Sequence, residues 1–159
     1  MAFQETIDCS HTKSLLRNPL AVSPLEDFTN GKFREIIGDK YVTKSKVKRV
    51  LFCSGKVYYD LFTRQQADKR KDIAIVRVEQ LFPMPDKQID LIVKTYPNAE
   101  YVWLQEEPKN MGAWTYWLRR PEHMSWRLIS RKPSSSPAVG FSKTHIAQQM
   151  ELVDEAFEE

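Results

Sequence analysis

Two stretches of this chain decide its fold: residues 78–85 read VEQLFPMP, and residues 101–114 read YVWLQEEPKNMGAW. The first begins one residue after the apolar run of residues 73–76, and the second opens with another apolar run at residues 101–104. Short apolar runs that end in acids and prolines are typical of strands covered on both faces of a sheet. We therefore predict two buried strands, each followed by polar residues.

The segment between these strands has the periodicity of a helix. Four apolar residues spaced at i, i+3, i+4 and i+7 share one helical face: Ile89, Ile92, Val93 and Tyr96. A strand, a helix and a second strand with this spacing form a crossover unit of a parallel sheet. The polar residues that follow the strands are then expected at the carboxyl edge of the sheet, where α/β proteins place binding surfaces.

The same pattern continues on both sides of this unit. Residues 50–53 are a further apolar run, and we predict a strand there and another at residues 126–130 (WRLIS). Helices are predicted after Lys56 and after Gly112, and the last helix is expected to bury Ile146, Met150, Val153 and Phe157. The pattern predicts an α/β fold of three layers, in which a mostly parallel sheet has helices on both faces.

The chain before the first predicted strand reads as an arm. We assign residues 1–45 to an N-terminal arm or linker and residues 46–159 to an α/β domain. Within the arm, residues 23–26 (SPLE) predict a helix start, with Ser at the cap and Pro at the first helical position. Residues 30–31 (NG) predict its end, and residues 33–37 predict one more apolar turn.

Composition is that of an ordinary globular domain and excludes several classes of protein. Of the 159 residues, 42% are hydrophobic and 28% charged, and the net charge of +3 gives no reason to expect a nucleic-acid partner. No run approaches the ~18 apolar residues of a membrane span. Two cysteines, Cys9 and Cys53, make neither a metal set nor a disulfide framework, and Cys53 is expected to be buried.

Two places could bind an anion or an effector. Lys56 follows a Ser-Gly pair between a strand and a helix, where free N–H groups favour anions, although a simple tight turn explains the same residues. The loop of residues 131–140 offers Arg131, Lys132 and Ser134, whose cations and hydroxyl suit a phosphate. A rigid interdomain loop is the alternative for this second place.

The polar end of the third strand reads as an interface rather than as a catalytic site. Adjacent strand residues point to opposite faces, so the two neighbouring glutamates are poor partners for acid–base work. The candidate interface residues are Glu106, Glu107, Asn110, Gly112 and Trp114. We predict no catalytic residue, no cofactor-binding residue and no metal ligand. Solvated or capping roles are expected for His11, His123 and His145.

Several ordered motifs resemble one known family. Besides residues 78–85 and 105–114, these are residues 13–20 (KSLLRNPL), 53–61 (CSGKVYYDL) and 134–140 (SSSPAVG). Together they resemble the C-terminal domain of the thiamine-diphosphate-dependent decarboxylating component of 2-oxoglutarate dehydrogenase, over roughly residues 13 to 157. The resemblance implies a transketolase C-terminal-like fold, with a five-stranded sheet in which one strand is antiparallel.

The resemblance also implies a function for the whole enzyme. That enzyme decarboxylates 2-oxoglutarate in the citric acid cycle and passes the succinyl group to a lipoyl arm. Its thiamine diphosphate and Mg²⁺ are held by two preceding domains of the same chain, so we expect neither cofactor here and no activity from this chain alone. The implied partners are those preceding domains, a second copy in a homodimer, and the dihydrolipoyl succinyltransferase complex.

For this chain the resemblance implies dimer packing, shaping of the active-centre entrance and effector binding, because members of the family have regulatory nucleotide or acyl-coenzyme A sites. Three alternatives stay open: an autonomous nucleotide- or acyl-coenzyme A-binding module, a pure assembly domain that binds no small molecule, and a relative that acts on 2-oxoadipate. The implied location is the cytoplasm of a bacterium or the mitochondrial matrix of a eukaryote.

Overall fold

The computed structural model describes residues 15–158 and divides the chain into two compact units, residues 1–33 and residues 34–159. Cys9, His11 and the first two residues of the KSLLRNPL motif lie outside the described residues. The boundary predicted at residue 45 falls inside the second unit. Each unit is described by itself.

The described part of the first unit, residues 15–33, contains one short helix. Helix α1 spans Leu25–Thr29 and ends at Asn30, as predicted. Its start differs from the prediction, because Pro24 rather than Ser23 occupies the cap position and no side chain caps the helix. Pro24 is extended, with φ −65° and ψ 156°, so the helix begins one residue later than the sequence pattern indicated.

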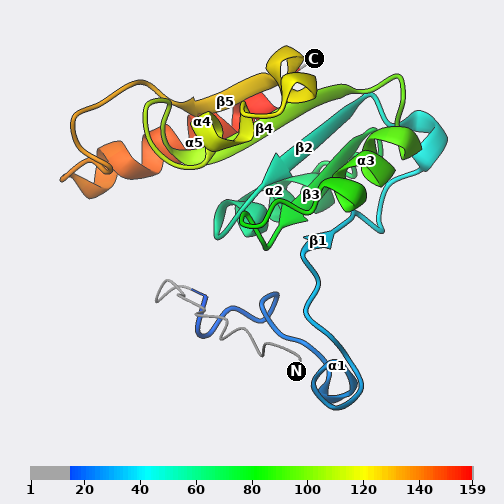
Figure 1. Cartoon of the computed structure of the whole chain (residues 1–159). Coiled ribbons are helices and arrows are strands. Elements are labelled where there is room, and N and C mark those ends of the chain that lie inside the picture. The colour runs from blue at the N-terminus through cyan, green and yellow to red at the C-terminus, as the bar shows by residue number, and fades with distance from the viewer. Residues whose placement is uncertain (1–14, 159) are drawn as a thin grey trace, which may run out of the picture. The chain divides into compact units, whose positions relative to one another are not determined.

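The second unit is built on a five-stranded sheet (Figure 1). In space the strands follow the order β1-β3-β2-β4-β5, and all neighbours are parallel except β1 and β3. This confirms the predicted mostly parallel sheet with one antiparallel strand. The strands are β1 (Ile36–Ile37), β2 (Arg49–Cys53), β3 (Ile73–Val78), β4 (Glu100–Pro108) and β5 (Arg127–Arg131).

The antiparallel strand lies where an apolar turn was predicted, and that prediction is wrong. Ile36 pairs with Val78 and Ile37 pairs with Arg77, so this segment forms strand β1 at the edge of the sheet. A strand of two residues is too short to show a period of two in its sequence. Its conformation is decided by pairing with the free edge of β3.

Helices cover both faces of the sheet, which confirms the three layers. Helices α2 and α5 pack on one face, and α3 and α4 on the other (Figure 1). The elements are α2 (Val57–Ala67), α3 (Asp86–Thr95), α4 (Trp114–Trp117) and α5 (Ser142–Phe157), with 3₁₀ turns η1 (Lys44–Lys46) and η2 (Pro121–Ser125). None of the helices among residues 15–158 is long and apolar enough to cross a bilayer.

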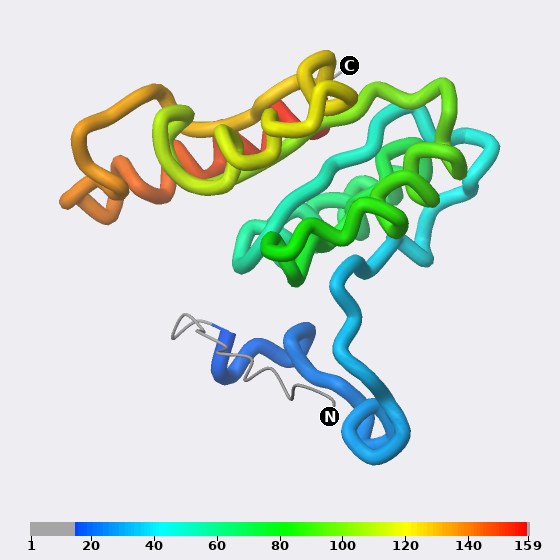
Figure 2. Tube along the Cα trace, viewed as in Figure 1, coloured from blue at the N-terminus to red at the C-terminus, as the bar shows by residue number. Residues whose placement is uncertain are grey.

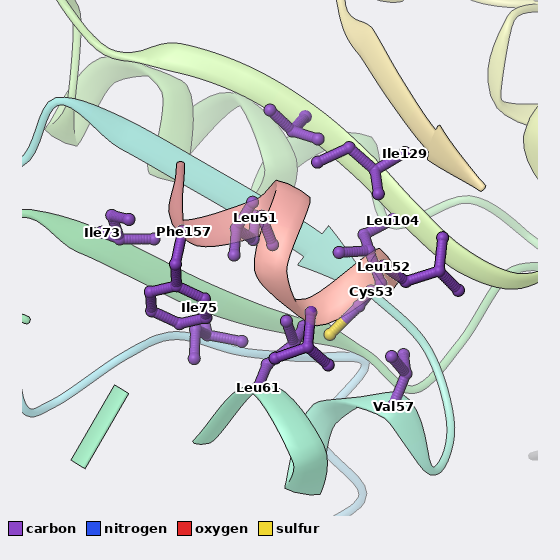
Figure 3. Packing of buried hydrophobic residues seen from close by; sticks show 13 residues of the cluster. Leu51, Cys53, Val57, Leu61, Ile73, Ile75, Leu104, Ile129, Leu152 and Phe157 are labelled. Atoms are coloured by element: carbon purple, nitrogen blue, oxygen red, sulfur yellow. The ribbon is translucent and has the colours of Figure 1, made fainter. Parts of the chain in front are cut away.

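The core under α2 and α5 is aliphatic. Figure 3 shows Leu51 and Leu104 from the strands meeting Leu61 of α2 and Leu152 of α5. Full burial of such a side chain is worth about 1.5–3 kcal/mol. Cys53 is fully buried here, as predicted, and burial raises the pKa of its thiol far above the ordinary value, so the thiol stays protonated and unreactive.

The core under α3 and α4 is aromatic. The rings of Trp103 and Trp117 stack with centroids 4.4 Å apart, and Phe52 lies 4.7 Å from Trp126. The apolar face predicted for α3 packs here as expected, with Ile89 and Tyr96 buried and Ile92 and Val93 partly buried against the cluster. Centroid separations of this size suit attractive aromatic pairs.

The face predicted for α5 is only half right. Figure 2 shows the chain leaving β5, making a wide loop and returning along α5. In the second half of the helix Val153 and Phe157 are buried as predicted, but Ile146 is 58% and Met150 61% exposed. The inward position in the first half belongs instead to a polar residue, Gln149, which is bound by charged groups.

Candidate functional site at the carboxyl edge of the sheet

Five polar side chains meet where the parallel strands end. This polar cluster consists of Lys56, Asp60, Glu106, Arg131 and Gln149. The Gln149 amide donates to the carboxylates of Asp60 (2.8 Å) and Glu106 (2.6 Å), and its oxygen accepts from Arg131 Nη2 at 3.0 Å. Lys56 Nζ lies 2.7 Å from Asp60 and 3.7 Å from Glu106. Two cations and two carboxylates are therefore joined by one buried amide.

The polar cluster changes how Lys56 and Arg131 are understood. Both were candidate anion ligands, and the structure does bring them to the same edge of the sheet. The ammonium of Lys56 already has two carboxylate partners, so an anion there would have to compete with Asp60 and Glu106. Arg131 is only 9% exposed, and its Nη2 also lies 3.3 Å from His145 Nδ1, which requires the proton of a neutral His145 to sit on Nε2.

Lys132 and Ser134 lie at a cavity of about 530 Å³ between the loop after β5 and helix α5, which we call the loop cavity. The Lys132 side chain is exposed and has no ion-pair partner among the residues described. The polar side chains that line the loop cavity are Ser130, Arg131, Lys132, Ser134 and Ser136 on the side of β5 and the loop after it, and Thr144, Gln148, Glu151 and Glu155 on the helix side.

Two hydrogen bonds connect the predicted interface loop to the predicted effector loop. Asn110 Nδ2 donates to the Ser134 carbonyl at 2.9 Å, and Asn110 Oδ1 accepts from the Ser134 N–H at 3.0 Å. Just upstream, Glu106 turns into the polar cluster while Glu107 is exposed, as alternate strand positions require. Residues 106–110 and 131–134 are thus parts of one surface.

Gln105, which the sequence pattern did not single out, holds the loop between β4 and α4. Its oxygen accepts from Trp103 Nε1 and from the Trp114 N–H, both at 3.0 Å. Its amide donates to the carbonyls of Met111 (2.7 Å) and Pro108 (3.1 Å). Trp114, a candidate interface residue, is almost completely buried in this chain, so most of its contact area is used inside the domain.

His123 was expected to be solvated or to cap a helix, and that prediction is wrong. The side chain is buried between Trp117, at a centroid distance of 4.5 Å, and Trp126, at 4.4 Å. Its Nδ1 lies 3.0 Å from the Trp117 carbonyl, so Nδ1 carries the proton and donates. The residue is therefore part of the aromatic core.

Comparison with known proteins now decides the family. The family profile described as 2-oxoglutarate dehydrogenase C-terminal matches residues 22–157. The chain belongs to this family.

Individual relatives agree with this assignment to the 2-oxoglutarate dehydrogenase C-terminal family. Over 91% of its length, the chain is 46% identical to the multifunctional 2-oxoglutarate metabolism enzyme of Mycolicibacterium vanbaalenii. Identity is 44% to the oxoglutarate dehydrogenase of Buchnera aphidicola and to the 2-oxoglutarate dehydrogenase E1 component of Haemophilus influenzae, each also over 91% of the chain. The chain spans only 13% of the first relative and 16% of the other two.

Substitution of Gly112 tests how tightly the β4–α4 loop of this 2-oxoglutarate dehydrogenase C-terminal domain is packed. Gly112 has φ +69°, and an added Cβ would lie 2.9 Å from the Gln105 amide nitrogen, which is held by hydrogen bonds. We expect Gly112→Ala to lower the unfolding free energy by about 2 kcal/mol, from backbone strain and displacement of Gln105.

Gly55→Ala is the matched control, because Gly55 has φ +76° with nothing near the added Cβ. It should cost only the backbone term, about 1 kcal/mol. Urea unfolding of both variants measures the difference, and equal losses would show that Gln105 gives way freely.

The buried histidine makes stability depend on pH. Burial lowers the pKa of His123 below its ordinary value, against the opposing effect of its hydrogen bond to the Trp117 carbonyl. Below about pH 6.5 the unfolded chain takes up a proton that the folded domain resists. The contribution of His123 is therefore full above that pH and is lost as the pH falls through the folded-state pKa.

We expect the unfolding free energy of the wild type to fall more between about pH 7.5 and about pH 5 than that of His123→Gln. Urea titrations at several pH values measure how the unfolding free energy of each protein changes with pH. Arg120, Glu122 and Asp86 also act on this ring, and they are present in both proteins, so comparing wild type with variant isolates the contribution of His123. The same pH dependence in both proteins would show that His123 does not cause the loss of stability.

The sequence offered one overlooked signal for the polar cluster. Lys56, the cap residue just before α2, and Asp60 in its first turn are four residues apart, a spacing at which opposite charges pair on a helix. Nothing in the sequence indicated Gln149, because an amide among apolar helix positions gives no sign of its distant partners.

Proposed function

We propose that this chain is the C-terminal domain of a longer enzyme that decarboxylates 2-oxoglutarate and passes the succinyl group to a lipoyl arm. The observation that supports this most strongly is 44% identity, over 91% of the chain, to a protein named as the 2-oxoglutarate dehydrogenase E1 component. That relative is about six times longer, since the chain spans 16% of it. The longer protein would act in the cytoplasm of a bacterium or the matrix of a mitochondrion.

In this proposal thiamine diphosphate and Mg²⁺ are held by the preceding domains. Among residues 15–158 no group of three or more histidine, cysteine, aspartate or glutamate side chains could hold a metal ion. The sequence also has no Gly-Asp-Gly loop for a diphosphate-bound magnesium ion. Residues 15–158 therefore offer no ligand set for the metal ion of the cofactor, and we derive no step of the decarboxylation through them.

The role of the chain itself would be assembly. We assign Glu106, Glu107, Asn110 and Gly112 to the surface that meets a second copy and the preceding domains, beside the entrance to the active centre. The buried Trp114 would support this surface from inside the domain. An exposed aromatic residue at the same edge of the sheet supports this role: Phe82, in the loop after β3, is 81% exposed and lies 6.5 Å from the ring of Tyr116. The dihydrolipoyl succinyltransferase complex would be the partner of the assembled enzyme.

Turnover by the purified 159-residue chain tests whether the cofactor and the reaction belong to the preceding domains. With thiamine diphosphate, Mg²⁺ and either 2-oxoglutarate or 2-oxoadipate, we expect no release of CO₂, and calorimetry should show no binding of thiamine diphosphate. Turnover of either acid by this chain alone would overturn the proposal.

The loop cavity supports a second role, the binding of an effector. A hollow of about 530 Å³ lies within the range of small-molecule sites, and Arg131, Lys132 and Ser134 line it. AMP and acetyl-coenzyme A are the first ligands to titrate, because the family resemblance implies regulatory nucleotide or acyl-coenzyme A sites. This role also covers the alternative that the chain is an autonomous regulatory module.

A further inference from the structure

Lysines from two segments gather at the amino ends of the parallel strands, at the edge of the sheet opposite the polar cluster. One segment is the 3₁₀ turn η1 with the residues that lead into β2, and the other is the loop between α2 and β3. Backbone hydrogen bonds hold the segments side by side. The Thr43 N–H donates to the Lys71 carbonyl at 3.3 Å. The Lys48 N–H donates to the Asp72 carbonyl at 2.7 Å. We call this group the lysine patch: Lys44, Lys46, Lys48, Lys69 and Lys71.

The positive charge of the lysine patch is not neutralised by ion pairs in the described part of the chain. All of its lysines are exposed, and none makes an ion pair with any of residues 15–158. Three carboxylates that adjoin the patch are bonded to arginines instead: Asp68 to Arg64, Asp72 to Arg70 and Glu100 to Arg49. Residues 40–49 are rich in Lys and Arg and contain no acid. A partner that brings negative charge is therefore attracted to this edge.

Lys69 adopts a backbone conformation that is unfavourable for lysine. It follows Asp68, the C-cap of α2, and its φ of +53° lies in the left-handed region. Glycine is the usual residue at this position after a helix, because it has no Cβ. Residues held in unfavourable backbone conformations are concentrated at functional sites. The conformation of Lys69 is thus an observation independent of charge that indicates a use for its ammonium group.

The surface around these lysines suits carboxylates better than nucleobases or lipids. The exposed hydroxyl of Ser45 lies between two of the lysines in the sequence and can donate to a carboxylate. Tyr41 has Lys71 Nζ over its ring, 5.3 Å from the centroid, so this ring is not free to stack on a base. Val42 and Val47, the aliphatic residues of the segment, pack against the aromatic core and are not available to insert into a bilayer.

We propose that the lysine patch binds an acidic segment of a partner protein. A single exposed ion pair contributes little, so binding requires several carboxylates of the segment to pair with several ammonium groups together. The proposal goes beyond the assembly role above, because that role uses the carboxyl edge of the sheet and the lysine patch lies at the amino edge. The two surfaces do not share a residue.

Decaglutamate is the probe for such an acidic segment, and decaglutamine, which has the same length and no charge, is its matched control. Fluorescence anisotropy of labelled peptides measures their binding to the 159-residue chain at about 150 mM salt, where exposed charges are partly screened. We expect decaglutamate to bind with a dissociation constant on the order of 100 μM, at least about tenfold more tightly than decaglutamine. Equal binding of the two peptides would overturn the proposal.

Substitutions at exposed lysines locate the site. One variant replaces three lysines of the patch: Lys44→Gln, Lys46→Gln and Lys71→Gln. A control variant has the same net charge and replaces three exposed lysines outside the patch: Lys87→Gln, Lys94→Gln and Lys143→Gln. We expect the patch variant to bind decaglutamate about tenfold more weakly than the wild type, and the control variant to stay within about twofold. Equal weakening in both variants would mean that only net charge attracts the peptide, and would contradict the proposal.

Lys69→Gly separates binding from folding. Glycine fits the left-handed conformation better, so the urea midpoint of unfolding should rise. Loss of the ammonium group should at the same time weaken decaglutamate binding by about threefold or more. A variant that is more stable and still binds decaglutamate as tightly as the wild type would contradict the place of Lys69 in the site.

Two other polyanions test the class of partner under the same conditions. Decathymidylate presents a nucleic-acid strand, and phosphatidylglycerol vesicles present an anionic membrane surface. We expect both to bind more weakly than decaglutamate at equal concentration of negative charge. Tighter binding of either would overturn the assignment to an acidic protein segment.

Discussion

Replacing Gln105 with leucine should lower the unfolding free energy of the domain by about 3 kcal/mol. The side chain is only 3% exposed, and its amide joins Trp103 and the Trp114 N–H to the carbonyls of Pro108 and Met111. Leucine has a similar volume but leaves these groups without partners in a place that water does not reach. The cost is therefore that of several unsatisfied buried groups rather than of one lost bond.

Gln66→Leu is the matched control for this change. Gln66 is half-buried on α2 and makes one side-chain bond, to Gln65 at 3.2 Å. The control should lose less than about 1 kcal/mol in the same urea titration. A Gln105→Leu loss no larger than that of the control would show that the β4–α4 loop does not depend on Gln105.

Replacing Trp117 with alanine should cost about 4 kcal/mol of unfolding free energy, the largest effect we expect from one substitution. Its fully buried ring stacks on Trp103 at 4.4 Å and on His123 at 4.5 Å, and lies 5.4 Å from Trp126. Because the indole N–H has no hydrogen-bond partner, the whole loss comes from packing and from the cavity that remains.

Tyr116→Ala is the control on the same short helix. It shows how much stability an alanine in α4 costs when little core packing is lost. Tyr116 is half-buried, and its ring contacts within residues 15–158 are with Phe82 and Arg119, so its replacement should cost about 1 kcal/mol. Urea unfolding followed by circular dichroism compares the two variants. Similar losses from both would mean that the aromatic core does not support α4 through Trp117.

The fold was most predictable in segments where hydrophobic periodicity or a continuous apolar run extends over several residues. The spacing of Ile89 and Tyr96 gave the buried face of α3, and the apolar run around Leu51 gave β2. The predictions for β1 and for the first half of α5 failed for one reason: contacts with other parts of the chain decide the structure of these two segments. Strand β1 exists because β3 offers a free edge, and the first half of α5 exposes Ile146 because charged groups from other elements bind Gln149.

The candidate site was predictable in its residue types but not in its pairing. Lys56 and Arg131 stood out as cations beside strand ends. The sequence could not show that Gln149 bonds to Asp60, 89 residues away, or to Glu106, 43 residues away. Such contacts depend on strand order, and the order β3-β2-β4-β5 does not follow the chain. The amide of Gln105 escaped notice because glutamine carries no charge and follows no period.

The central claim is that these residues complete a 2-oxoglutarate dehydrogenase, and a domain replacement measures this most directly. Residues 22–157 would replace the matching segment of the Haemophilus influenzae E1 component, which is 44% identical to this chain. Turnover of 2-oxoglutarate is then measured with thiamine diphosphate and Mg²⁺. We predict that the chimera is active and that the parent without the segment is not; a folded chimera with no more turnover than the truncated parent would contradict the account.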